Sequence, residues 1–183
     1  MLGYCGFLQL NTWFFQHRER QHLYRLMHEE RPIENGLLQT RSAVSTKSPR
    51  SVAPNGLIGR MEILRLGVSV IIMEGTDTST LRSAAGHIEG TALPGQPGNV
   101  GIAGHRDTFF RPLRSIQRNE LVTLTTLDGE YRYRVVSTKI VSPKDIAVLA
   151  SNENEVLTLV TCYPFYFVGA APGRFIVRAE RVP

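Results

Sequence analysis

The sequence predicts a mainly β domain, folded as a closed or nearly closed barrel with short helices, behind an N-terminal helical anchor or stalk. Three observations predict it. Many short runs rich in β-branched residues follow Leu57, separated by Gly, Pro, Asn and Asp, and helical spacing is rare among them. An apolar stretch opens the chain, and a linker rich in Ser, Thr and Pro precedes Leu57. The predicted units are residues 1–16, residues 17–56 and residues 57–183.

Residues 2–15 form a mostly apolar run that ends in Trp13, Phe14 and Phe15, and charged residues follow it. A helix that spans a bilayer needs about 20 apolar residues, and this run is shorter. Two interpretations stay open. We favour the outer half of a signal anchor whose beginning is missing from this sequence. The other is an amphipathic helix that lies at an interface or packs on the domain.

Helical spacing continues over residues 16–34, where Leu23, Leu26 and Met27 share one face and charged residues surround them. This pattern predicts a juxtamembrane helix or stalk. Residues 35–56 have little apolar periodicity and many turn-forming residues, which is typical of a linker.

The predicted elements of the barrel follow in chain order. Residues 76–86 open with the helix cap Thr76-Asp77-Thr78 and predict a short helix that ends at a glycine. Residues 109–118 and 144–150 predict turns or short helices, and Asp128-Gly129 predicts a tight hairpin turn. Strands are expected at residues 57–65, 67–73, 100–103, 121–127, 130–141, 156–162 and 174–182.

Composition excludes two classes of protein. The formal net charge is +5, but much of the basic charge lies in residues 17–50, outside the predicted core. No RNA-binding motif, zinc-finger spacing or basic recognition helix is present, so nucleic-acid binding is not expected. The two cysteines, Cys5 and Cys162, are too few for a disulfide framework. Because Cys5 lies in the apolar N-terminal stretch, we do not expect the two to pair.

Three chemical groups occur at the ends of predicted strands. Cys162 ends the run Thr158–Cys162, His105 follows an earlier apolar run within Gly104–Asp107, and Arg174 opens the last run. A cysteine on an apolar strand is by itself a small buried hydrophobe. Together, however, the three groups supply a nucleophile, a proton-handling imidazole and a fixed cation. This combination indicates a cysteine acyl-transfer site.

These residues and their neighbours also have simpler interpretations. A histidine at a strand end, without the cysteine and the arginine, would be interpreted as structural. Arg178 shares a strand face with Arg174 and competes for its role; we prefer Arg174 because it follows the loop that leaves Cys162. The side chain of Thr161 points away from that of Cys162 on an ideal strand, so we expect a supporting role. The backbone at Cys162 would supply one oxyanion donor.

These residues resemble the sortase family. The matching segments are Gly104–Asp107, Thr158–Cys162 with its TLxTC pattern, and Arg174, and the likeness runs from Gly56 to Pro183. Several further segments most resemble class D sortases: Gly86–Ala92, Pro94-Gly95, Gly98-Asn99, His105–Phe110 and Cys162–Phe165.

The resemblance implies an eight-stranded barrel that carries a membrane-anchored cysteine transpeptidase outside the cytoplasm, with a single-pass N-terminal anchor. Cys162 would attack the threonine carbonyl of an LPxTG-like sorting signal, and the thioacyl-enzyme would pass to an amine acceptor in the cell envelope or a pilin. It implies that His105 acts as general acid and base and that Arg174 stabilises substrate or oxyanion. His87, Arg106 and Asp107 would have supporting or substrate-binding roles.

The implied partners are secreted proteins that bear sorting signals, the amine acceptor and, through the N-terminus, the membrane. No cofactor or metal is implied, although calcium stimulation is compatible with the family. The segment Leu93-Pro94-Gly95 resembles the start of a sorting signal but lacks Thr-Gly, so we interpret it as structural. Two alternatives stay open: a peptidase that uses water as acceptor at the same site, and a non-enzymatic envelope scaffold in which Cys162 is structural.

Overall fold

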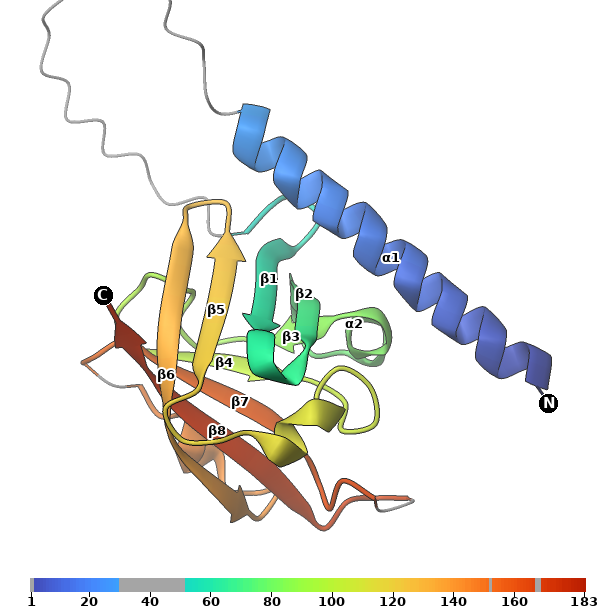
Figure 1. Cartoon of the computed structure of the whole chain (residues 1–183). Coiled ribbons are helices and arrows are strands. Elements are labelled where there is room, and N and C mark those ends of the chain that lie inside the picture. The colour runs from blue at the N-terminus through green and yellow to red at the C-terminus, as the bar shows by residue number, and fades with distance from the viewer. Residues whose placement is uncertain (1, 30–51, 152, 167–168) are drawn as a thin grey trace, which may run out of the picture.

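The structure is a computed structural model that describes residues 2–29, 52–151, 153–166 and 169–183. Figure 1 shows a barrel with one long helix lying along its side. The strands are β1 (Leu57–Ile63), β2 (Val68–Glu74), β3 (Ala85–His87), β4 (Asn99–Ala103), β5 (Leu121–Thr126), β6 (Glu130–Val141), β7 (Val156–Tyr163) and β8 (Gly173–Val182). The helices are α1 (Leu2–Glu29), α2 (Thr78–Ser83) and the 3-10 turns η1 (Leu64–Leu66), η2 (Arg111–Ser115) and η3 (Ile146–Leu149).

The described strands form a closed barrel in the order β1-β2-β3-β4-β7-β8-β6-β5, and the pairing of β1 with β5 closes it. The pairs β2–β3 and β4–β7 are parallel and the others are antiparallel. This confirms the predicted eight-stranded barrel with short helices. The two parallel pairs matter for function, because they bring together the ends of strands that are remote in the sequence.

The predicted helix over residues 76–86 is wrong at its C-terminal end. The start is as expected, since Asp77 accepts hydrogen bonds from the backbone N–H groups of Ser79 (2.8 Å) and Thr80 (3.1 Å). Side-chain hydrogen bonds from these residues hold the pKa of Asp77 below its usual range. The helix ends at Ser83, however, and the following residues form β3. Pairing with β2 decides this, because Ala85 joins the buried core opposite Ile72.

The barrel interior is filled by alternate side chains of every strand, as the period of two requires. On β7 the core side chains are Leu157 and Leu159, and on β4 they are Val100 and Ile102. Phe110, from the loop after β4, is fully buried in the same core. The other face of β4, β7 and β8 points away from this core, and it is partly exposed at Cys162 and Arg174.

Helix α1 is continuous across the predicted boundary between residues 16 and 17, and its second half packs on the barrel. Leu23 is 2% exposed and packs with Leu57 of β1 and Ile71 of β2. Full burial of one such side chain stabilises by about 1.5–3 kcal/mol. Around these residues lie Phe15, Leu26 and Met27. The part of the predicted stalk within α1 is thus a packed part of the fold, whereas residues 30–51 of the predicted linker lie outside the described residues.

Gln16 fixes this docking through both ends of its side-chain amide. Its Oε1 accepts from the backbone N–H of Ile71 (2.9 Å), on β2 before the pairing with β3 begins. Its Nε2 donates to the carbonyl of Ser83 at the end of α2 (2.6 Å). Because Gln16 is buried, both bonds are shielded from water. One side chain therefore joins α1, β2 and α2.

Within the described ranges, α1 and the shorter helices lack the combination of length and apolar character that crossing a bilayer requires. The truncated anchor at residues 1–16 stays a prediction.

Candidate active site

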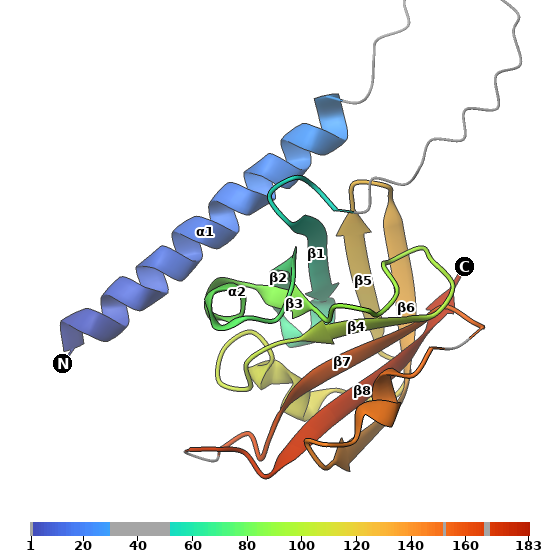
Figure 2. The ribbon, with the colours of Figure 1, turned by 180° about the vertical axis from the view of Figure 1, so that it is seen from behind.

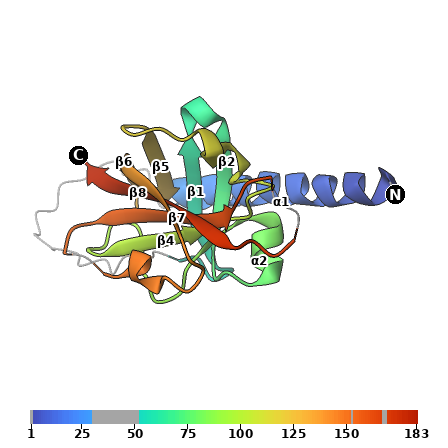
Figure 3. The same cartoon turned by 90° about the horizontal axis from the view of Figure 1, so that it is seen from below.

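Strands β4, β7 and β8 are neighbours, and β7 lies between the other two (Figures 2 and 3). In the antiparallel pair β7–β8, Cys162 lies directly opposite Arg174. Residues directly opposite each other have Cβ atoms about 5 Å apart and share one face of the sheet. The register therefore places a guanidinium beside the thiol.

His105 reaches the level of Cys162 from the other side. The parallel pair β4–β7 ends with Ala103 opposite Val160, and the ladder continues for one more bond, from the N–H of Gly104 to the carbonyl of Val160 (3.1 Å). The hydroxyl of Thr161 then donates to the carbonyl of Gly104 (2.7 Å). Gly104 is therefore level with Thr161, and His105 follows at the level of Cys162, with a strand spacing of about 5 Å.

The orientation of Gly104 shows which face His105 takes. A Cβ on Gly104 would lie 2.8 Å from the ring of the core residue Phe110, so this position points into the barrel. Strand alternation, continued past the end of β4, predicts that the next residue, His105, points outward. Thr161 is buried and Cys162 is partly exposed, which gives the same alternation on β7. The strand register thus brings the backbone positions of His105, Cys162 and Arg174 to the same end of three adjacent strands.

All three side chains are partly exposed, so a substrate can reach them. Nη1 of Arg174 donates to the carbonyl of Gly173 (3.0 Å) and more weakly to that of Ala171 (3.4 Å). These bonds use one nitrogen of the guanidinium, and its other N–H groups can donate to a ligand. In the described part of the chain no hydrogen bond or ion pair joins the three side chains to one another. Bonds between catalytic groups often tighten only when substrate is bound.

The register also separates the two competing arginines. Arg178 lies opposite Thr158, four positions along β7 from Cys162, or about 13 Å. Both arginines are on the same face of β8, but only Arg174 is a neighbour of the thiol.

Thr161 supports the site from inside the barrel. It is 2% exposed, and its bond to Gly104 ties β7 to the residue that precedes His105. Its position on the face opposite Cys162 is the one that strand alternation predicts.

Replacing Thr161 by valine is expected to destabilise the fold by about 1–3 kcal/mol and to lower kcat, because the carbonyl of Gly104 loses its buried partner. Thr161→Ser, which keeps the hydroxyl, should restore most of both. Urea denaturation and peptide-cleavage rates measure the two effects. An equal loss in the serine variant would assign the effect to the methyl group and contradict a positioning role.

Arg106 and Asp107 lie in the loop after His105 and differ in their surroundings. Nη2 of Arg106 donates to the carbonyl of Gly169 (2.9 Å), in the segment between β7 and β8. It therefore links the two loops that leave the ends of β4 and β7. Asp107 is exposed.

His87 lies away from the other predicted site residues. His87 on β3 pairs with Ile102 on β4, and Ile102 pairs with Leu159 on β7. Cys162 therefore lies two strands away from His87 and about 10 Å further along β7. His87 is 3% exposed, and its ring nitrogens contact the carboxylate of Glu74 (3.0 Å) and the carbonyl of Ala92 (3.0 Å). The structure thus places its imidazole in a buried link between β2, β3 and the following loop.

Asn99 is a buried polar residue whose role the sequence analysis missed. Its Nδ2 donates to the carbonyls of Val148 (3.1 Å) and Ala150 (3.2 Å), and its Oδ1 accepts from Thr158 (2.7 Å). These bonds hold η3 against the outer face of β4, where a Cβ on Gly101 would lie 3.2 Å from Leu149. The signal available in the sequence was an asparagine that opens an apolar run.

The segment that contains Gly95 is bound to the far end of the barrel. The N–H of Gly95 donates to Glu155 (3.0 Å), which also accepts from the phenol of Tyr133 and pairs with Arg181 (3.4 Å). Burial and the Glu155 carboxylate raise the pKa of Tyr133 well above its usual range, so this phenol stays protonated and can donate. These contacts agree with the structural interpretation of Leu93-Pro94-Gly95.

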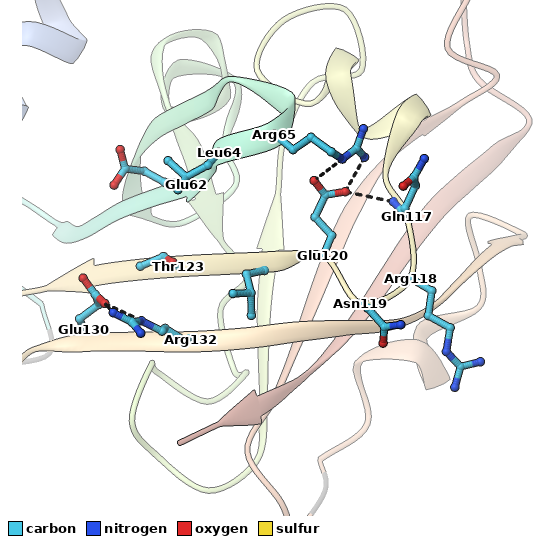
Figure 4. A pocket seen from close by; sticks show the side chains of 11 residues that line it. Glu62, Leu64, Arg65, Gln117, Arg118, Asn119, Glu120, Thr123, Glu130 and Arg132 are labelled. Carbon is cyan, nitrogen blue, oxygen red and sulfur yellow. Dashed lines mark hydrogen bonds and ion pairs between the residues drawn. The ribbon is translucent and has the colours of Figure 1, made fainter.

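A hollow of about 660 Å³ lies elsewhere on the barrel, over β1, β5 and the turn before β5 (Figure 4). Two ion pairs lie in its lining: Arg65 bonds Glu120, and Arg132 pairs with Glu130 (2.8 Å). Neither a cysteine nor a histidine lines it. Within the described ranges, His, Cys, Asp and Glu form no group of three that could hold a metal ion. That the chemistry needs no metal stays a prediction.

Comparisons with known proteins agree with this geometry. Residues 61–182 match a protein-family profile described as Sortase domain. The chain is 33% identical to Sortase D of Bacillus subtilis over 98% of this chain and 91% of that protein. It is similar to the structure of a Clostridium perfringens Sortase D5 transpeptidase, with a TM-score of 0.63 and 32% identity over 70% of this chain and 79% of that one. It is also similar to sortase C1 of Streptococcus agalactiae, with a TM-score of 0.67 and 28% identity over 74% and 72% of the two chains.

Proposed function

Because this chain belongs to the sortase family of cysteine transpeptidases, we propose that it cleaves an LPxTG-like sorting signal after the threonine and joins the new acyl end to an amine. The observation that supports this most directly is the strand register. In this register Cys162 is opposite Arg174, and the backbone of His105 follows at the same level on the other side of β7.

In the first half-reaction, the sulfur of Cys162 attacks the carbonyl carbon of the threonine. Negative charge develops on the carbonyl oxygen, where Arg174 and the backbone N–H of Cys162 can stabilise it. His105 donates a proton to the departing amine as the C–N bond breaks. The products are a thioacyl-enzyme on Cys162 and the released fragment that begins with glycine.

In the second half-reaction, the nitrogen of an acceptor amine attacks the thioester carbon. The C–S bond breaks, a C–N bond forms, and His105 carries the proton from the amine to the departing sulfur. The enzyme returns to its starting state with an amide product. In this proposal the donors are secreted proteins with sorting signals, and the acceptor is an amine of the cell envelope or a pilin. The part of residues 1–16 that precedes Trp13 attaches the protein to the membrane.

Mass spectrometry with an LPxTG-type peptide, with and without an added amine, tests the proposal. We expect an adduct on Cys162 and a ligated product that forms faster than the hydrolysed one. Hydrolysis that dominates at saturating amine would favour the peptidase alternative. Absence of both adduct and product across a broad peptide set would contradict the proposal and favour the scaffold.

A further inference from the structure

A cavity of about 840 Å³ lies between α1 and the barrel, and His105 is part of its lining. Trp13 and Arg20 line it from α1, Arg82 from α2, and Asp107 and Phe109 from the loop after His105. Its volume lies within the range of sites that bind small molecules or short peptide segments. The cavity therefore joins one member of the predicted catalytic group to a surface that the N-terminal helix completes.

The lining combines cationic and aromatic side chains. Arg20 is partly exposed, and its buried Nε has no hydrogen-bond partner, while Nη2 makes a long bond to Ser69 (3.5 Å). Arg82 is exposed, and Asp107 is the one carboxylate in the lining. Two guanidiniums against one carboxylate leave a net positive charge in the lining. Such a site favours a ligand that carries an anionic group.

The packing of α1 makes this cavity a stable feature. Gln16 lines the cavity and bonds both β2 and α2, and Leu23 buries its side chain about two turns further along α1. Figure 1 shows α1 running past β2 and α2, with its N-terminal end beyond the barrel. Arg20 and Trp13 are therefore held on the barrel by the same contacts that dock the helix.

The order of the strands indicates from which side of Cys162 the acceptor amine approaches in the second half-reaction. Arg174 flanks Cys162 on the β8 side, where it would face the carbonyl oxygen, whereas His105 flanks it on the β4 side. The acceptor nitrogen must lie within hydrogen-bond reach of His105 to lose its proton. Of the three predicted catalytic residues, His105 alone lines the cavity. An acceptor bound there would therefore have to extend its amine past His105 to reach the thioester on Cys162.

We propose that this cavity binds the acceptor, and that the acceptor is an amine that carries an anionic group held by Arg20 and Arg82. The inference rests on the proposed transpeptidase function. The neutral amine nitrogen forms the new C–N bond, its proton passes through His105 to the sulfur of Cys162, and the C–S bond breaks. The anionic group, a carboxylate or a phosphate, stays bound throughout and orients the amine.

Competition kinetics with the full chain test the proposal. The carboxylate arm compares triglycine with triglycine amide, and the phosphate arm compares O-phosphoethanolamine with ethanolamine, each with an LPxTG-type donor. We expect the anionic member of at least one pair to have the lower acceptor KM, and the arm with the larger difference identifies the group. Equal KM values within both pairs would overturn the proposal.

The double variant Arg20→Ala, Arg82→Ala should raise the KM of the preferred anionic acceptor by about 10- to 100-fold, because each charge-assisted hydrogen bond is lost. Its KM for the neutral partner should change little. The matched control is Arg25→Ala, Arg118→Ala, which removes two exposed arginines outside the cavity, one of them on α1. Rates are compared at equal amounts of thioacyl-enzyme, measured by mass. A KM rise of equal size in both double variants would overturn the proposal.

Trp13, the single tryptophan of the chain, supplies a second readout. In a Cys162→Ala background, titration with the preferred anionic amine should change its fluorescence, and the double variant should lose the change. An unchanged emission spectrum in the double variant without acceptor verifies that α1 remains docked. If the unmodified chain forms no thioacyl adduct with any donor, the proposed function fails. If the adduct forms but acceptor charge has no effect, only the cavity assignment fails.

Discussion

Replacing Cys162 by alanine is expected to abolish both cleavage and ligation of an LPxTG-type peptide, with a fall in rate of at least about 10⁴-fold. The sulfur forms the covalent bond to the acyl group, and Cys162 is the one cysteine whose surroundings the structure describes. Its partly exposed position on the outer face means that truncation leaves no cavity in the barrel core. The adduct mass and the ligated product are the quantities to measure.

Thermal denaturation supplies the control for this variant. The melting temperature should stay within a few degrees of that of the unmodified chain, because the lost atom lies outside the core. Retained cleavage in Cys162→Ala would contradict the assignment of the nucleophile. A large loss of stability in Cys162→Ala, together with no cleavage or ligation by the unmodified chain, would support the scaffold alternative, in which Cys162 is structural.

Replacing Arg174 by alanine is expected to lower kcat/KM for the peptide by about 10²- to 10³-fold, the usual effect of removing an oxyanion donor. Arg174 lies directly opposite Cys162, and its guanidinium is anchored to the carbonyl of Gly173 (3.0 Å). Lysine keeps the charge but not the fork of donors, so Arg174→Lys should recover only part of the loss. Steady-state cleavage rates measure each variant.

Arg178→Ala is the matched control, because it removes the same group from the same face of β8. Arg178 lies opposite Thr158, four positions from the thiol, and we expect less than about a tenfold effect. Equal losses at the two positions would show that the charge of the strand face matters rather than the contact with Cys162. A larger loss at Arg178 would reverse the assignment.

Most of the predicted elements depended on contiguous residues, and for that reason sequence patterns could predict them. Asp77 begins a short helix because its carboxylate accepts from the next backbone N–H groups. Asp128-Gly129 lies between β5 and β6, as the tight turn predicted. The alternation over Thr161-Cys162 placed one side chain inside the barrel and the other outside. Each of these outcomes is decided within a few residues.

The elements that the sequence analysis missed depend on distant partners. Ala85 and Gly86 follow a helix in the sequence, yet they form β3 because β2 offers a parallel edge. Gln16 lies in a polar part of α1 but is buried, since its amide bonds both β2 and α2. His87 has the same chemistry as His105, and only its position opposite Ile102 shows that it lies away from Cys162.

By itself, the sequence determined the class of fold and the chemical groups of the site, because strand periodicity, turns and the Thr158–Cys162 pattern are local properties of the chain. Only the tertiary structure decided which groups are neighbours. Parallel pairing of β4 with β7 and antiparallel pairing of β7 with β8 set His105 and Arg174 on either side of Cys162. The docking of α1 beside His105 likewise results from long-range contacts, which no local pattern encodes.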